Sequence, residues 1–139
     1  MQRILLAEDN KINQVVAAGV LKKIGYEVDI VEDGAAAVAA VTAVPERTYG
    51  AVLMDVMMPG ADGYQATAMI RSFERQFGRE PLPIIGLSAR AMAGDRDIAI
   101  NAGMNDYLTK PLRTRDLEDS LLRWVKPVPV PAQAAPEGA

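Results

Sequence analysis

Residues 51–55 read Ala-Val-Leu-Met-Asp, a short apolar run that ends on a carboxylate. Similar runs recur along the chain and predict further strands at Arg3–Glu8, Glu27–Val31, Pro83–Ser88 and Asp106–Thr109. Helical patterns separate and follow the strands, and they predict helices at Lys11–Ile24, Gly34–Val44, Gly63–Phe77, Gly94–Ala102 and Thr114–Val125. Strands that alternate with helices are typical of an α/β fold whose parallel sheet is buried on both faces.

The composition narrows the functional classes. The chain has 139 residues, a net charge of -3 and no cysteine, which excludes disulfides, zinc–thiolate sites and thiol catalysis. It has no basic stripe for nucleic acid and no apolar run near the ~20 residues of a membrane span. We therefore expect no nucleic-acid partner and no direct membrane contact. The start Met-Gln-Arg leads into a strand rather than a signal peptide, so we expect a cytoplasmic location.

The composition changes sharply near the end of the chain. Residues 127–139 are rich in proline and alanine, and they predict an extended linker or a disordered tail. Residues 1–126 would then form a single folded domain.

Carboxylates stand at the ends of two predicted strands, Glu8-Asp9 after the first and Asp55 at the end of the third. Because the carboxyl ends of parallel strands share one edge of the sheet, these side chains should converge. Converging carboxylates repel unless a cation lies among them, and oxygen ligands suit Mg²⁺, with Mn²⁺ as an alternative. The other interpretation is that Glu8 and Asp9 only cap the first helix.

Two further residues fall at the same edge. Lys110 follows the fifth strand and could reach a phosphoryl group on Asp55, and the hydroxyl of Ser88 could donate to the same group. Taken alone, Lys110 would only end a strand and Ser88 would be a turn residue. The isomer of the bond between Lys110 and Pro111 stays open from sequence.

Several short motifs resemble those of response-regulator receiver domains, over residues 3–125. They are Glu8-Asp9-Asn10, Leu53-Met54-Asp55-Val56-Met57-Met58-Pro59, Asp62-Gly63, Ser88-Ala89 and Tyr107-Leu108-Thr109-Lys110-Pro111-Leu112. Three other segments are similar to receivers of hybrid sensor histidine kinases, namely residues 8–13, 63–67 and 102–107. The resemblance implies a flavodoxin-like (βα)5 three-layer sandwich with strand order 2-1-3-4-5.

The resemblance also implies a phosphorelay role. Asp55 would accept a phosphoryl group from a histidine kinase or a histidine phosphotransfer domain, which must supply the histidine because this chain has none. Asp9, Asp55 and the carbonyl of Met57 would hold Mg²⁺, and Glu8 would act through a metal-bound water. Ser88 and Lys110 would stabilise the phosphoryl oxygens.

Other residues receive regulatory roles by the same resemblance. Ser88 would move towards the phosphoryl group and leave space for Tyr107, the switch residue, although a tyrosine packed at a strand edge with its hydroxyl in water is common. Met57 and Arg90 depart from well-studied receivers at positions that should flank the path of the attacking water. Met57 cannot readily position a water and Arg90 could cover or pair with the phosphoryl group, so we expect hydrolysis without help from either, unless both side chains point into solvent.

The first helix carries more apolar surface than one sheet needs. Its apolar residues spread over about 240°, wider than a stripe of ~100°, so some of this surface has no core to cover. The resemblance to receivers of hybrid kinases suggests that Ile12 and Val15 meet a helical phosphotransfer partner there. A generously apolar amphipathic helix is the alternative.

Three functional classes follow, of which a phosphoacceptor receiver is favoured. An Mg-dependent phosphohydrolase with an Asp nucleophile usually has a second Asp two positions later, where this chain has Met57. A pseudo-receiver normally lacks the acceptor or the lysine, and both are present. We expect that a receiver on its own is not an enzyme, although it assists its own phosphorylation and dephosphorylation. A hybrid parent protein would be a protein histidine kinase. We expect a fragment of a hybrid histidine kinase, with a single-domain response regulator as the alternative.

Overall fold

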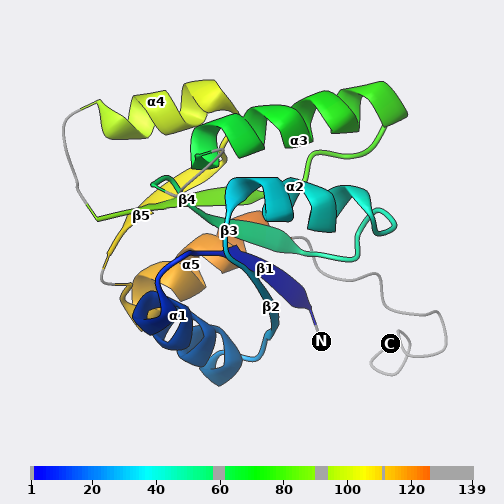
Figure 1. Cartoon of the computed structure of the whole chain (residues 1–139). Coiled ribbons are helices and arrows are strands. Elements are labelled where there is room, and N and C mark those ends of the chain that lie inside the picture. The colour runs from blue at the N-terminus through cyan, green and yellow to red at the C-terminus, as the bar shows by residue number, and fades with distance from the viewer. Residues whose placement is uncertain (1, 58–61, 90–93, 111, 126–139) are drawn as a thin grey trace, which may run out of the picture.

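The computed structural model describes residues 2–57, 62–89, 94–110 and 112–125. Strands and helices alternate along the chain (Figure 1), in the order β1 (Arg3–Ala7), α1 (Lys11–Lys23), β2 (Glu27–Val31), α2 (Gly34–Thr42), β3 (Ala51–Asp55), α3 (Gly63–Phe77), β4 (Ile84–Ser88), α4 (Asp95–Ala102), β5 (Asp106–Thr109) and α5 (Thr114–Trp124). The strands pair in parallel in the order β2-β1-β3-β4-β5. The predicted α/β fold and strand order are confirmed.

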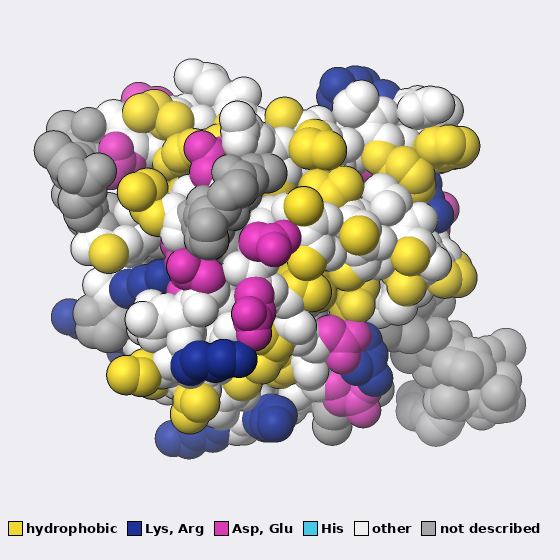
Figure 2. Space-filling model, viewed as in Figure 1, with side chains coloured by type: hydrophobic (Ala, Val, Ile, Leu, Met, Phe, Trp, Pro, Cys, Tyr) yellow, Lys and Arg dark blue, Asp and Glu magenta, His cyan; other side chains and the backbone are white. Residues whose placement is uncertain are grey.

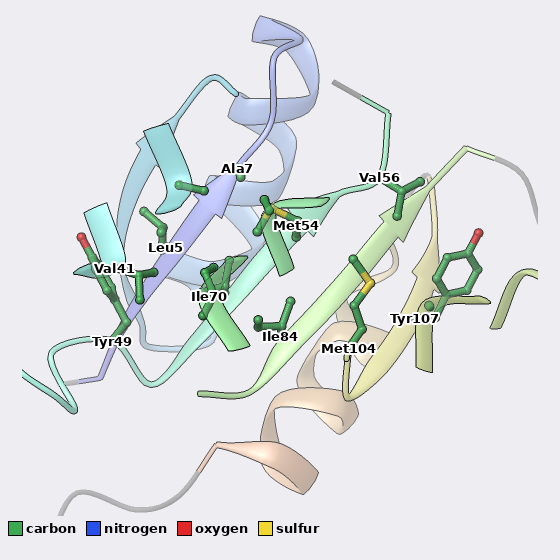
Figure 3. Packing of buried hydrophobic residues seen from close by; sticks show 14 residues of the cluster. Leu5, Ala7, Val41, Tyr49, Met54, Val56, Ile70, Ile84, Met104 and Tyr107 are labelled. Atoms are coloured by element: carbon green, nitrogen blue, oxygen red, sulfur yellow. The ribbon is translucent and has the colours of Figure 1, made fainter. Parts of the chain in front are cut away.

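Helices cover both faces of the sheet, with α1 and α5 on one side and α2, α3 and α4 on the other (Figure 1). Side chains alternate between the two layers because successive residues of a strand point to opposite faces. In β1, Leu5 and Ala7 join the α2/α3 layer, whereas Ile4 and Leu6 join the α1/α5 layer. Figure 3 shows the first of these layers, which extends from Tyr49 at one end to Tyr107 at the other.

Three of the helices, α1, α2 and α3, begin at side-chain caps. Asn10 caps α1, because its side-chain oxygen accepts from the Asn13 amide at 3.0 Å. The alternative interpretation, that Glu8 and Asp9 only cap the first helix, is therefore wrong. Asp62 and Gln65 form a capping box at the start of α3.

The predicted element boundaries differ from the structure by one or two residues. The strand β1 ends at Ala7 rather than Glu8, and β4 begins at Ile84 because Pro83 has no amide hydrogen to pair. The helix α2 ends at Thr42, since a residue that precedes a proline, here Val44, disfavours helical backbone. Gly94, which has a left-handed φ of 89°, lies before α4 rather than inside it.

Three sequence predictions concern residues outside the described part of the chain, namely Arg90, Pro111 and the tail at 127–139. Among the described residues, no helix combines the length and the apolar character that crossing a lipid bilayer requires.

Candidate functional site

Three carboxylates converge at the carboxyl ends of β1 and β3. Glu8 and Asp55 are 1% and 3% exposed, and Asp9 lies exposed beside them. One carboxylate oxygen from each residue lies within 4.8 Å of the other two. A donor set made only of carboxylate oxygens fits a hard divalent cation such as Mg²⁺. On the face shown in Figure 2, several acidic side chains gather near the middle.

Lys110 joins the two buried carboxylates. Its ammonium nitrogen lies 2.7 Å from Glu8 Oε1 and 3.0 Å from Asp55 Oδ2. Burial of the ammonium opposes its charge, but the hydrogen bonds to Glu8 and Asp55 outweigh this and raise the pKa of Lys110 above its usual 10.5. The lysine is therefore a fixed positive charge at neutral pH.

The backbone positions Lys110 beside Ser88. The strands β4 and β5 pair so that Ser88 lies opposite Thr109, and the Lys110 amide donates to the Ser88 carbonyl at 2.7 Å. Ser88 itself is buried at the end of β4. The structure thus brings Glu8, Asp9, Asp55, Ser88 and Lys110 to one edge of the sheet, as the sequence predicts.

Backbone amides fix the orientation of both buried carboxylates. The Met57 amide donates to Asp55 Oδ1 at 3.0 Å, and the Asn10 amide donates to Glu8 Oε2 at 3.2 Å. The side-chain amide of Gln14, buried on α1, donates to the Glu8 carbonyl at 2.6 Å. Sequence analysis missed Gln14, although its position among the inward-facing residues of α1 was a usable signal.

Gly63 belongs to one of the receiver-like motifs, but its structural role was not predicted from the sequence. It begins α3, its amide donates to the Val56 carbonyl at 3.3 Å, and a β-carbon built on it would overlap the Asp55 carbonyl oxygen. Only glycine permits so close an approach of the helix to the backbone of β3. The signal in the sequence was a glycine at the predicted first position of a helix.

Tyr107 lies in the core with its ring packed on β4. Its hydroxyl donates to Asp95 Oδ2 at the start of α4 over 3.4 Å, and a β-carbon on Gly86 would lie 3.3 Å from its ring. Burial, followed by the neighbouring Tyr107 and Asp95, raises the pKa of Tyr64. The hydroxyl of Tyr107 thus has a protein partner in Asp95. This differs from the alternative in which the ring of Tyr107 is packed and its hydroxyl lies in water.

Asp106, directly before Tyr107, ties α4 and α5 to β5. The buried carboxylate accepts from Arg96 of α4 at 2.9 Å and from Ser120 and Trp124 of α5 at 2.7 and 3.0 Å. Burial alone would raise its pKa, but the bonds from Ser120, the Tyr107 amide, Trp124 and Arg96 outweigh burial and lower the pKa below 3.8. Sequence analysis missed this residue.

The remaining predicted residues lie at the surface around the site. The Met57 side chain is 68% exposed, and Ile12 and Val15 on the first turns of α1 are 74% and 73% exposed. Arg90 lies outside the described residues. The exposed pair on α1 follows the acidic residues Glu8 and Asp9 by only a few positions.

Comparison with known proteins identifies the family. The family model of the response regulator receiver domain matches residues 4–122. The chain belongs to this family. The receiver is 43% identical over 122 residues to the sensor protein GacS of Pseudomonas syringae pv. syringae, and the match covers 88% of this chain. The match covers only 13% of GacS, so this chain corresponds to a small part of that relative.

Solved structures show the same fold. One is the receiver domain of the sensor histidine kinase PA1611 from Pseudomonas aeruginosa PAO1, solved with a magnesium ion coordinated in its active-site cleft. It is 45% identical to this receiver, with a TM-score of 0.77. The match covers 88% of this receiver and 96% of that chain. Another is the co-crystal structure of the Saccharomyces cerevisiae histidine phosphotransfer protein Ypd1 and the receiver domain of its downstream response regulator Ssk1. A chain of that structure is 30% identical to this receiver, with a TM-score of 0.82. The match covers 89% of this receiver and 88% of that chain. The curated relatives also include hybrid signal transduction histidine kinase A of Dictyostelium discoideum, 34% identical over 123 residues, where the match covers 88% of this chain and 6% of that protein. The receiver is therefore similar to those of hybrid sensor histidine kinases.

Proposed function

We propose that this receiver takes a phosphoryl group from a phosphohistidine onto Asp55. The observation that carries the proposal is the placement of Asp55: its carboxylate lies within reach of Lys110 and of two further carboxylates, at the edge where parallel α/β sheets bind ligands. The domain would assist its own phosphorylation and dephosphorylation, and it would turn over no other substrate.

Asp9 and Asp55 would hold a divalent cation directly, with the Met57 carbonyl as a further ligand and Glu8 acting through a metal-bound water. Mg²⁺ suits these oxygen donors, and Mn²⁺ has similar ligand preferences. When bound, the cation supplies positive charge that offsets the repulsion between the carboxylates and an incoming phosphoryl group.

The transfer needs few groups from the protein. A carboxylate oxygen of Asp55 attacks the phosphorus, and an O–P bond forms as the N–P bond of the donor breaks. The electron pair of the broken bond stays on the imidazole, which takes a proton from water. The ammonium of Lys110 would give up part of its contact with Asp55 and bind one phosphoryl oxygen instead. The hydroxyl of Ser88 would donate a hydrogen bond to a second phosphoryl oxygen.

Tyr107 would report the change to the surface. As Ser88 moves towards the phosphoryl group, it would leave a space that the ring of Tyr107 can enter. The populations of the α4–β5–α5 face then shift, and this face would bind the next partner. The contact between Tyr107 and Asp95 at the start of α4 supports this route.

The phosphodonor would be a histidine kinase or a histidine phosphotransfer domain, and Ile12 and Val15 on α1 would form part of its docking surface. The similarity to a small part of the sensor protein GacS supports a place within a larger sensor protein. That protein would be a hybrid histidine kinase, with this receiver on its cytoplasmic side. A single-domain response regulator is the alternative context.

The lifetime of the phosphoryl group would be set partly by the residues around it. The Met57 side chain is apolar and exposed, so it offers no hydrogen bond to an attacking water. We propose that hydrolysis proceeds without help from Met57 and that Arg90 covers or pairs with the phosphoryl group.

Intact-mass spectrometry after incubation with acetyl phosphate and Mg²⁺ tests the proposal. We expect one phosphoryl adduct on the wild type, none on Asp55→Asn and none in EDTA. Asp97→Asn removes the same charge from an exposed position of α4 and should keep the adduct. No adduct on the folded wild type, including in a quenched time course, would contradict the proposal.

A further inference from the structure

A cavity of about 200 Å³ lies at the opposite end of the sheet from Asp55. It is formed by the segments that lead into β3 and β4, and its walls are mainly apolar, with Val44, Pro45, Tyr49, Phe73, Leu82 and Pro83 among the lining residues. Gly50 and Pro83 directly precede strands that end at Asp55 and Ser88, so the cavity and the carboxylates are separated by a full strand length.

The chain leaves α5 at the edge of this cavity. Gly50 and Gln2 line the cavity, and a β-carbon on Gly50 would lie 2.9 Å from Gln2 Oε1 and 3.1 Å from Val125 Cγ1. Val125 has φ of -77° and ψ of 122°, close to the polyproline II values of about -75° and +145°. The backbone is thus already extended where it passes the cavity.

The sequence that follows suits an apolar, aromatic groove. Residues 127–131 read Pro-Val-Pro-Val-Pro. Prolines at every second position disfavour helices and central strands and favour the stiff polyproline II conformation, which aromatic-lined grooves bind at low entropic cost. At about 3.1 Å per residue, five residues extend roughly 15 Å from a point close to Val125, which lies beside the lining residue Gly50.

We propose that residues 127–131 dock into this cavity and cover Tyr49, Phe73 and Leu82. The segment would cross the amino ends of the strands, from the α1/α5 layer to the α2/α3 layer. Docking would fix the direction in which the chain leaves the domain, and it does not depend on phosphorylation of Asp55.

Nuclear Overhauser effects in the full 139-residue chain, labelled with ¹³C, test the proposal. We expect cross-peaks between the methyl groups of Val128 or Val130 and the rings of Tyr49 and Phe73. The Val128→Asp/Val130→Asp variant should lose these cross-peaks and shift the amide signals of the lining residues. The control, Ala134→Asp/Ala135→Asp, places the same charges further along the tail and should retain the cross-peaks.

Two results would overturn the proposal. One is the absence of cross-peaks between these valines and the two rings in the wild type. The other is their appearance as intermolecular signals in a mixture of labelled and unlabelled protein, because the cavity would then hold the tail of a second copy.

Discussion

The ammonium of Lys110 lies 3.0 Å from the carboxylate of Asp55, although 55 positions separate the two residues in the sequence. The same nitrogen lies 2.7 Å from Glu8. Because both carboxylates are buried, their charges depend on a nearby cation. Lys110 provides that charge within the protein itself.

Replacement of Lys110 by alanine should therefore leave two buried carboxylates without their partner. We expect the free energy of unfolding in EDTA to fall by roughly 3 kcal/mol, and Mg²⁺ to restore part of the loss. Urea titration followed by fluorescence of the single tryptophan measures this. Lys23→Ala, at an exposed position of α1, is the control and should change little. Equal stability of the two variants would contradict the prediction.

Gly86→Ala should disturb the packing of Tyr107. The added methyl group would lie 2.6 Å from Met104 Sδ and 3.3 Å from the Tyr107 ring, and overpacking of this kind costs about 1–3 kcal/mol. We expect lower stability and a changed ring environment for Tyr107, measured by NMR. Gly19→Ala, which meets nothing within 4 Å on exposed α1, should stabilise the protein by up to ~1 kcal/mol. Unchanged Tyr107 signals in Gly86→Ala would count against the packing argument.

Asp106→Asn should make stability less sensitive to acid. Because folding lowers the pKa of Asp106 below 3.8, its carboxylate stabilises the folded state above that pH. The contribution is lost as the pH falls through 3.8 towards the lower folded pKa. We expect wild type to exceed the variant by roughly 2 kcal/mol near pH 6, and the gap to shrink below about pH 4. Urea unfolding at each pH measures the gap, and a gap that is constant down to pH 3 would disprove the assignment. Asp97→Asn is the exposed control.

Ile12→Asp/Val15→Asp should weaken docking of a histidine phosphotransfer domain without harming the fold, since both side chains are largely exposed. Loss of about 1.4 kcal/mol or more of apolar contact would lower affinity at least tenfold. Titration calorimetry with a cognate phosphotransfer domain measures the affinity, and acetyl phosphate labelling should be unchanged. Met69→Asp, an exposed apolar residue of α3, is the control. Undiminished affinity in the double variant would remove α1 from the docking surface.

Met57→Asn and Arg90→Ala test the proposed lifetime control. An asparagine at position 57 can hydrogen-bond a water near Asp55, and loss of Arg90 would uncover the phosphoryl group, so both variants should lose the adduct faster than wild type. The decay of the adduct after removal of acetyl phosphate measures this by intact mass. Identical decay in all three proteins would show that neither side chain matters.

The sequence was sufficient for the sheet because short apolar or β-branched runs alternate with helical patterns, and several of these runs lead into a polar residue, as residues 51–55 do. Strand order places those ends side by side, so the grouping of Asp55 with Glu8 and Lys110 could be predicted. The sequence marks Gln14 as inward-facing and Gly63 as the first residue of a helix, but the contacts that these residues and Asp106 make could not be predicted, because they depend on how closely α1, α3 and α5 approach the sheet. Such distances are set by packing in three dimensions, which periodicity along the chain does not encode.

Val125 lies against Gly50, at the start of the strand whose far end carries Asp55. Five residues of strand separate these ends by about 16 Å. The chain therefore leaves α5 at the end of the sheet opposite the carboxylates. A phosphodonor that docks beside Asp55 and the chain that leaves α5 therefore lie at opposite ends of the sheet and need not compete for the same space.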